Sequence, residues 1–175
     1  MTYTPLGAVA RGLTAGVAGT AAMTGWQSLA ARLRSADQAD GDAGQGGAPD
    51  DPWARASVPA RLGRRVIEGV FEREVTPDKI GLLTNVMHWG YGTAWGAVYG
   101  LLEGSRPGRS IRRGLVFGAG VWAMSYAQLV PIGLYEPPWK YPPSELALDL
   151  SYHVAYGLGV GVGWSLLDRL VGGGL

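Results

Sequence analysis

The two histidines of the chain and the residues around them are best suited to chemistry. His88 and His153 are the side chains that change charge near neutral pH. Asp149 precedes His153 by four residues, so the two share one face of a helix. There the carboxylate favours the protonated imidazole. This pattern predicts a site that handles a proton or a small solute.

Three amides can join the histidines and the aspartate. Asn85 lies three residues before His88 and shares its helical face. Gln27 and Gln128 lie near the ends of two other uncharged segments. A polar side chain inside an apolar helix is costly and needs a partner or a purpose. The predicted site therefore consists of Gln27, Asn85, His88, Gln128, Asp149 and His153.

The same residues allow other interpretations. Each histidine is followed by glycines four and eight residues later, which leaves room for haem b with His88 and His153 as axial ligands. The two imidazoles and Asp149 could hold a divalent metal ion of unknown identity. A structural or partner-binding role, in which they only hydrogen-bond between helices, is a third reading. No HExxH, GxSxG or P-loop motif is present, so no catalytic residue is predicted and an enzyme is disfavoured.

Four segments without charged residues must position these side chains. They cover residues 12–31, 80–102, 114–135 and 150–167, each 18 to 23 residues long. At about 1.5 Å per residue, these lengths match the hydrocarbon core of a bilayer. The sequence therefore predicts an all-α fold, a polytopic membrane four-helix bundle forming one domain over residues 1–175. Its helices are expected over residues 6–31, 77–103, 112–134 and 144–169.

Two segments between the first and second of these helices differ in character. Residues 35–56 are rich in Asp and Gly and lack an apolar period, which predicts a flexible loop. Over residues 57–73, apolar side chains such as Val58, Leu62 and Val66 recur at helical spacing, opposite arginines and glutamates. This second pattern predicts an amphipathic helix at the membrane interface.

The second half of the chain resembles the first. An offset of 65 residues pairs His88 with His153 and also aligns a tyrosine and two glycines. The first and third uncharged segments align likewise and pair Gln27 with Gln128. We therefore predict a tandem duplication of a two-helix hairpin, with copies related by a pseudo-twofold axis. The duplication would gather the six polar residues around that axis.

Glycines recur at every fourth position in several of these segments. Gly92, Gly96, Gly100 and Gly104 form one such ridge, and small residues at this spacing let helices approach closely. The ridges predict tight helix packing and a possible homodimer. Glu103, at the end of the same segment, is expected to be a solvated boundary charge.

Composition excludes several classes of protein. The absence of cysteine excludes disulfide scaffolds and thiolate metal sites. The 15 Lys+Arg nearly balance the 14 Asp+Glu, so no nucleic-acid partner is expected. The predicted partners are a lipid bilayer and a proton or small solute. Four arginines within residues 103–113 favour a cytoplasmic (inner) membrane protein with both termini inside.

Residues 11–23 (RGLTAGVAGTAAM) and 88–100 (HWGYGTAWGAVYG) resemble the uncharacterised bacterial inner-membrane family typified by YagU. The resemblance covers about half of the chain and implies an association with acid resistance. We therefore predict a small integral membrane protein that handles a proton or small solute at the six-residue site, in acid or envelope stress. A bis-histidine haem protein is the alternative.

Overall fold

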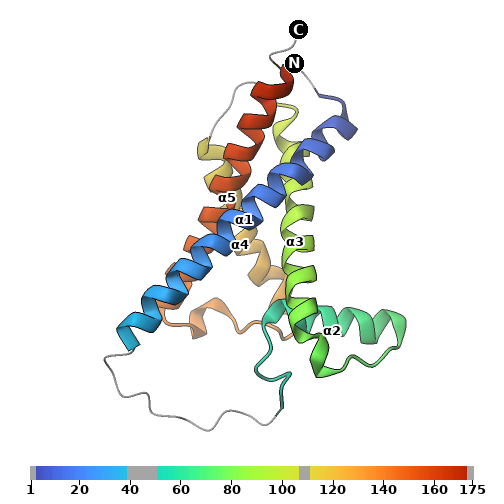
Figure 1. Ribbon diagram of the computed structural model, residues 1–175, viewed down its shortest axis with the longest axis vertical. Helices are drawn as coiled ribbons and strands as arrows, with labels where there is room; N and C mark the ends of the chain where they lie inside the picture. The colour runs from blue at the N-terminus through green and yellow to red at the C-terminus, as the bar shows by residue number, and fades with distance from the viewer. Residues whose placement is uncertain (1–2, 39–50, 107–110, 173–175) are drawn as a thin grey trace.

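The computed structural model describes residues 3–38, 51–106 and 111–172, and these residues contain helices and no strand (Figure 1). The prediction of an all-α fold is therefore confirmed. The long helices are α1 (Pro5–Gln38), α3 (Ile80–Glu103), α4 (Ile111–Leu129) and α5 (Pro143–Gly172). The shorter elements are α2 (Val58–Phe71) and the 3-10 turns η1 (Pro77–Lys79) and η2 (Pro138–Lys140).

The predicted membrane location is wrong. Among the described residues, no helix combines the length and the apolar composition that a membrane crossing requires. The charge-free windows are rich in Gly, Ala, Ser and Thr, whose small side chains add little apolar surface, and they also contain uncharged polar side chains such as Asn85, His88 and His153. Freedom from charge is therefore not the same property as an apolar span. The expectation of a multi-pass inner-membrane protein with both termini inside fails for this reason.

The four long helices form a bundle in which α1 is central. α1 packs along both α3 and α5, and α5 packs along α4. Glycine allows the close approach: Gly16 of α1 lies against the backbone of Gly92 and Gly96 in α3. In the same way, Gly118 of α4 lies against Gly157 of α5. These glycines are covered within one chain, so they are not free faces for the predicted homodimer.

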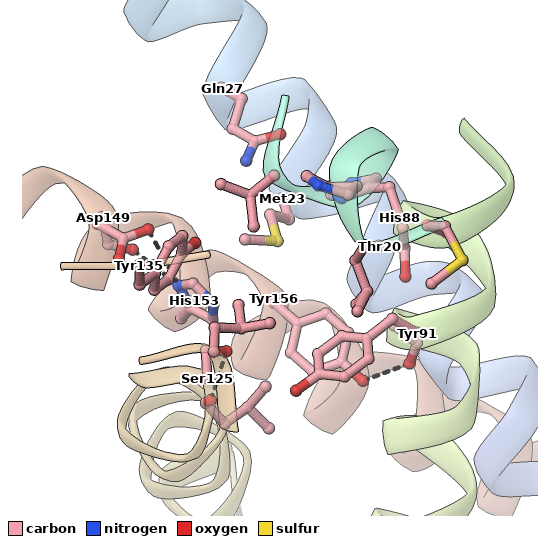
Figure 2. A pocket seen from close by; sticks show the side chains of 17 residues that line it. Thr20, Met23, Gln27, His88, Tyr91, Ser125, Tyr135, Asp149, His153 and Tyr156 are labelled. Carbon is pink, nitrogen blue, oxygen red and sulfur yellow. Dashed lines mark hydrogen bonds and ion pairs between the residues drawn. The ribbon is translucent and has the colours of Figure 1, made fainter. Parts of the chain in front are cut away.

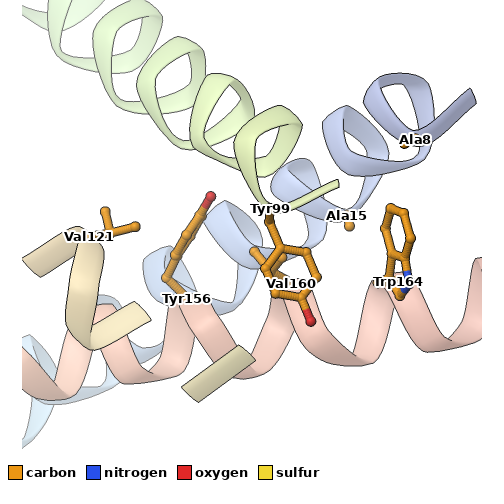
Figure 3. Packing of buried hydrophobic residues seen from close by; sticks show 7 residues of the cluster. All are labelled: Ala8, Ala15, Tyr99, Val121, Tyr156, Val160 and Trp164. Atoms are coloured by element: carbon orange, nitrogen blue, oxygen red, sulfur yellow. The ribbon is translucent and has the colours of Figure 1, made fainter. Parts of the chain in front are cut away.

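Aromatic side chains fill the space between α3 and α4. The ring centroid of Phe117 in α4 lies 5.0 Å from that of Tyr99 and 6.0 Å from that of Trp95 in α3. Trp164 of α5 lies 6.0 Å from Tyr99. Rings at these distances and steep angles attract each other edge to face. The buried core around them consists of Ala8, Ala15, Tyr99, Val121, Tyr156, Val160 and Trp164 (Figure 3).

A buried ion pair joins the end of α3 to the start of α4. Glu103 is 3% exposed, and its two carboxylate oxygens accept hydrogen bonds from Arg113 Nε at 2.7 and 2.9 Å. Arg113 Nη2 donates a further bond to the same carboxylate. The prediction of a solvated charge at Glu103 is therefore wrong. The carboxylate tolerates burial because the guanidinium satisfies both of its oxygens.

α2 lies across the lower end of α3, far from the start of α1 and the end of α5 (Figure 1). Ser57 caps it, because the hydroxyl accepts a hydrogen bond from the backbone N–H of Ala60 at 3.4 Å. Ala60 and Gly63 are buried, and Gly63 approaches Leu83 of α3. The inner face of this amphipathic helix is therefore covered by α3 and not by a membrane interface.

The segment predicted as a flexible loop is partly ordered. Residues 35–38 belong to α1, and residues 39–50 lie outside the described residues. Trp53 is 7% exposed and packs with Ala60, Val75 and Leu83 in a second apolar cluster. The Asp- and Gly-rich composition of the segment gave no indication that this tryptophan is buried. Its packing holds the chain in place just before α2.

The helix bounds differ from prediction mainly at the end of α1, which continues to Gln38 beyond the predicted residue 31, and at the end of α4. The helix predicted over residues 112–134 ends at Leu129, and Pro131 follows, which has no backbone N–H to continue the helix. Gly133 has φ +68°, a conformation that favours glycine. The backbone N–H of Leu134 then returns to the Leu129 carbonyl at 2.9 Å. This turn places Tyr135 in the wall of a cavity between the helices.

Candidate functional site

A cavity of about 180 Å³ lies among the four long helices (Figure 2). Val58, Pro59 and Leu62 close part of it from the first turns of α2. Most of its wall is apolar or aromatic, and a few polar side chains from α1, α3 and α5 point into the space. This combination of an apolar wall and a few convergent polar groups is typical of small-molecule sites.

Four of the six predicted site residues line this cavity. Gln27 comes from α1, His88 from α3, and Asp149 and His153 from α5. The two histidines thus reach one space from the two different hairpins. The pairing by the 65-residue offset and the placement in the fold therefore agree for these two side chains.

The other two predicted residues are outside the cavity. Asn85 is exposed and donates Nδ2 to the carbonyl of Gly81 in its own helix at 2.9 Å. Gln128 is also exposed, and its Oε1 accepts a hydrogen bond from the Tyr91 hydroxyl at 3.0 Å. Neither amide faces the histidines, so the predicted cluster of six reduces to four.

His153 is held in one tautomer. Its Nδ1 lies 2.9 Å from the backbone carbonyl oxygen of Asp149 and 3.6 Å from Asp149 Oδ1. A carbonyl oxygen can only accept, so Nδ1 carries the hydrogen in the neutral ring. The lone pair of neutral His153 is therefore on Nε2, which makes no hydrogen bond with the described residues. The side chain is 9% exposed, so this nitrogen is available mainly to an occupant of the cavity.

His88 is held in the opposite tautomer. Its Nε2 lies 3.1 Å from Thr24 Oγ1, and that hydroxyl donates to the Thr20 carbonyl at 2.8 Å. Because the hydroxyl hydrogen is already used, Nε2 must donate to Thr24 and the lone pair of neutral His88 lies on Nδ1. Burial lowers the pKa of His88, and the charge of protonated His153 lowers it further. The neutral form is therefore favoured near neutral pH.

Two aromatic side chains of α4 hold Asp149. Trp122 Nε1 donates to Oδ2 at 3.0 Å, and the Tyr126 hydroxyl donates to the same oxygen at 3.2 Å. An indole N–H can only donate, so this oxygen accepts. While both histidines are neutral, Asp149 is the lining residue with a full charge.

Three tyrosines of the cavity were missing from the sequence prediction. Tyr91, Tyr135 and Tyr156 line it, and the Tyr156 hydroxyl donates to the Gly92 carbonyl at 2.6 Å. Burial raises the pKa of Tyr135 to about 12 and also raises that of Tyr156, so both are neutral near pH 7. The 65-residue offset also pairs Tyr91 with Tyr156 and was a usable signal for these two.

The haem and metal alternatives fit the cavity less well than a small solute does. The part of the chain that the structure describes has no group of three or more His, Asp or Glu side chains placed to hold a metal ion. The cavity of about 180 Å³ is below the roughly 300–1,000 Å³ of drug-sized sites, and haem is larger still. Moreover, His88 Nε2 already donates to Thr24, and iron ligation through that nitrogen would break this bond.

No family model, curated protein or solved structure matches the chain. The resemblance to the YagU family therefore remains a prediction from the residues that carry it. The cavity and its hydrogen bonds are the available evidence for function.

Proposed function

We propose that the protein binds a small solute in this cavity and that binding is coupled to the protonation of His88 and His153. One observation carries the proposal: two histidines from different hairpins line the same cavity, and their hydrogen bonds leave one unprotonated nitrogen on each ring. A proton-coupled site would also suit a role in acid stress, which the resemblance to the YagU family implies.

The charge of the cavity supports the coupling. With neutral histidines, Asp149 gives the lining residues a formal charge of −1, and protonation of both imidazoles changes it to +1. A charged or strongly polar solute will therefore bind one protonation state more tightly than the other. By linkage, the solute then shifts the pKa of the histidines by the same coupling free energy.

The other elements around the histidines add few titratable groups. α1 contributes Gln27 and other uncharged residues, and α2 lines the cavity with apolar side chains. Arg61 of α2 donates a hydrogen bond from Nη2 to the Leu134 carbonyl at 3.3 Å, and its charge offsets a small part of the rise in the pKa of Tyr135. Arg61 does not line the cavity. From α4, Tyr126 engages Asp149. The pH response should therefore come mainly from the two histidines.

We also propose that the site formed by tandem duplication of a helical hairpin. The support is that α1 with α3 and α4 with α5 both pack through glycines. Gly16 against Gly92 and Gly118 against Gly157 are examples from the two pairs. Each hairpin then contributes one histidine to the shared cavity.

The test uses methionine methyl groups as reporters. Met23 and Met87 line the cavity, whereas Met124 is 43% exposed on α4 and does not. We would label the methyl groups of the full chain with ¹³C and add three probes that share a tert-butyl group: tert-butylammonium, tert-butanol and pivalate. At least one probe should shift the Met23 signal and leave Met124 in place. Its affinity should differ by about tenfold or more between about pH 8 and about pH 5.5.

Variants show whether the histidines cause the pH dependence. His88→Gln together with His153→Gln should abolish it, because neither side chain titrates. Asn85→Ala is the matched control, since Asn85 is a polar residue of α3 outside the cavity, and it should bind as the wild type does. If no probe shifts Met23 more than Met124 at either pH, the proposed function is wrong.

A further inference from the structure

The cavity has the electrostatic character of a cation site. Its lining contains Asp149 and, among the described residues, no arginine or lysine. Trp122 and Tyr126 both donate hydrogen bonds to Oδ2 of this carboxylate. Oδ1 has the His153 ring 3.6 Å away. With neutral histidines, the lining of the cavity therefore has one formal negative charge that no other lining residue neutralises.

The other polar atoms of the lining mainly offer lone pairs. The tautomers derived above leave His88 Nδ1 and His153 Nε2 as hydrogen-bond acceptors. Gln27 adds an amide whose oxygen can also accept. A solute that donates hydrogen bonds is therefore better matched to the cavity than one that accepts them.

The aromatic lining suits the same class of solute. Tyr91, Tyr135 and Tyr156 line the cavity, and Figure 2 shows Tyr91 and Tyr156 close together at its centre. The ring faces of neutral tyrosines attract cations, most strongly when the cation is desolvated. Met23 points into the same space and offers a polarizable surface for an alkyl group.

From these features we infer that the solute is a small organic cation, an ammonium group on a compact apolar body. This inference rests on the proposed function, because it assigns the chemical class of the solute at the same site. Asp149 is the counter-ion, the two histidine nitrogens accept hydrogen bonds from the ammonium group, and the tyrosine rings surround the alkyl part. A cavity of about 180 Å³ limits the solute to a few carbon atoms.

The inference sets the sign of the pH effect. Protonation of either histidine replaces an acceptor by a donor and adds a positive charge beside the cation. The cation and the protons therefore compete, and affinity should fall as the pH decreases. An anion would show the opposite trend, and an uncharged solute only a weak one.

The three tert-butyl probes test the inference in the wild-type chain. At about pH 8, tert-butylammonium should bind at least about tenfold more tightly than tert-butanol or pivalate, as read from the Met23 methyl shift. Its affinity should fall at least about tenfold at about pH 5.5. Asp149→Asn should weaken binding of the cation by at least the same factor and leave tert-butanol binding unchanged, whereas Asn85→Ala should change neither.

The outcomes separate the two proposals. If tert-butanol or pivalate binds as tightly as tert-butylammonium at about pH 8, the cation inference is wrong while solute binding stands. If none of the three probes shifts Met23 more than Met124, solute binding itself is wrong. The comparison of probes needs no variant, so it remains decisive even if Asp149→Asn fails to fold.

Discussion

Replacement of Glu103 by glutamine should destabilise the protein strongly, because it removes the negative charge that the partly buried guanidinium of Arg113 contacts. Glu103 is 3% exposed, and Arg113 contacts both of its carboxylate oxygens. Glu103→Gln keeps the shape of the side chain but removes the negative charge that the guanidinium contacts. Breaking a buried pair from one side costs about 3 to 5 kcal/mol. Arg113 retains 29% exposure, so we expect a loss near the lower end, about 3 kcal/mol.

Urea unfolding followed by circular dichroism measures this loss. With a slope of about 2 to 3 kcal/mol per molar urea, a loss of about 3 kcal/mol lowers the midpoint by roughly 1 to 1.5 M. Glu136→Gln is the matched control, because Glu136 pairs with Lys140 at 2.7 Å but both side chains are about 60% exposed. An exposed pair contributes about 0 to 1 kcal/mol, so the midpoint of this control should change little.

A double variant separates charge from packing. Glu103→Leu combined with Arg113→Met removes both charges and should cost less than Glu103→Gln alone, because no unpaired charge is left. The reasoning would be refuted if Glu103→Gln and Glu136→Gln shifted the midpoint equally. It would also be refuted if the double variant were less stable than Glu103→Gln.

Two further predictions concern the glycine contacts and the histidines. Gly118→Ala should destabilise the fold by about 1 to 3 kcal/mol, because the added Cβ would overlap the His153 carbonyl oxygen. Gly120→Ala should stabilise the fold by up to about 1 kcal/mol, because nothing lies within 4 Å of the added Cβ. Equal changes in Tm for the two variants in thermal unfolding would contradict this pair of predictions. Burial lowers the pKa of His88 in the folded state, so the unfolded chain binds more protons and stability should fall as the pH decreases through the ordinary histidine range near 6.5. His88→Gln should flatten the dependence of Tm on pH across that range, and an unchanged slope would show that other groups cause it.

The features that could be predicted from sequence are those that follow from helical periodicity and from the repeat. Period and glycine spacing indicate helices, and the structure is all-helical in its described parts. The 65-residue offset pairs His88 with His153, and the structure places both residues in the lining of one cavity. Such patterns survive because helix geometry alone determines which side chains share a face.

The features that were missed depend on tertiary contacts. By spacing, Asn85 shares a helical face with His88. The two side chains nevertheless point about 60° apart around the helix axis, and only His88 lines the cavity. Trp122 and Tyr126 support Asp149 from a different helix, and no spacing in the sequence links them. Burial of Glu103 is tolerated because Arg113, near the start of α4, donates hydrogen bonds to its carboxylate.

The membrane prediction failed for a different physical reason. Charge-free windows of the required length exist, but their small residues leave no described helix apolar enough to cross a membrane. In this chain the small residues instead bring helices into backbone contact, as Gly96 does with Gly12 and Gly16. The same composition thus fits close packing within one bundle.

Nitrogen NMR of the two histidine rings tests the central claim most directly. The chain has 2 histidines, so the ring signals of ¹⁵N-labelled protein are assigned with a single variant, His88→Gln. At about pH 8, the hydrogen should reside on Nε2 of His88 and on Nδ1 of His153, and saturating tert-butylammonium should shift both rings and lower the pH at which they protonate. Two rings in the same tautomer, with a titration that no probe alters, would contradict the account.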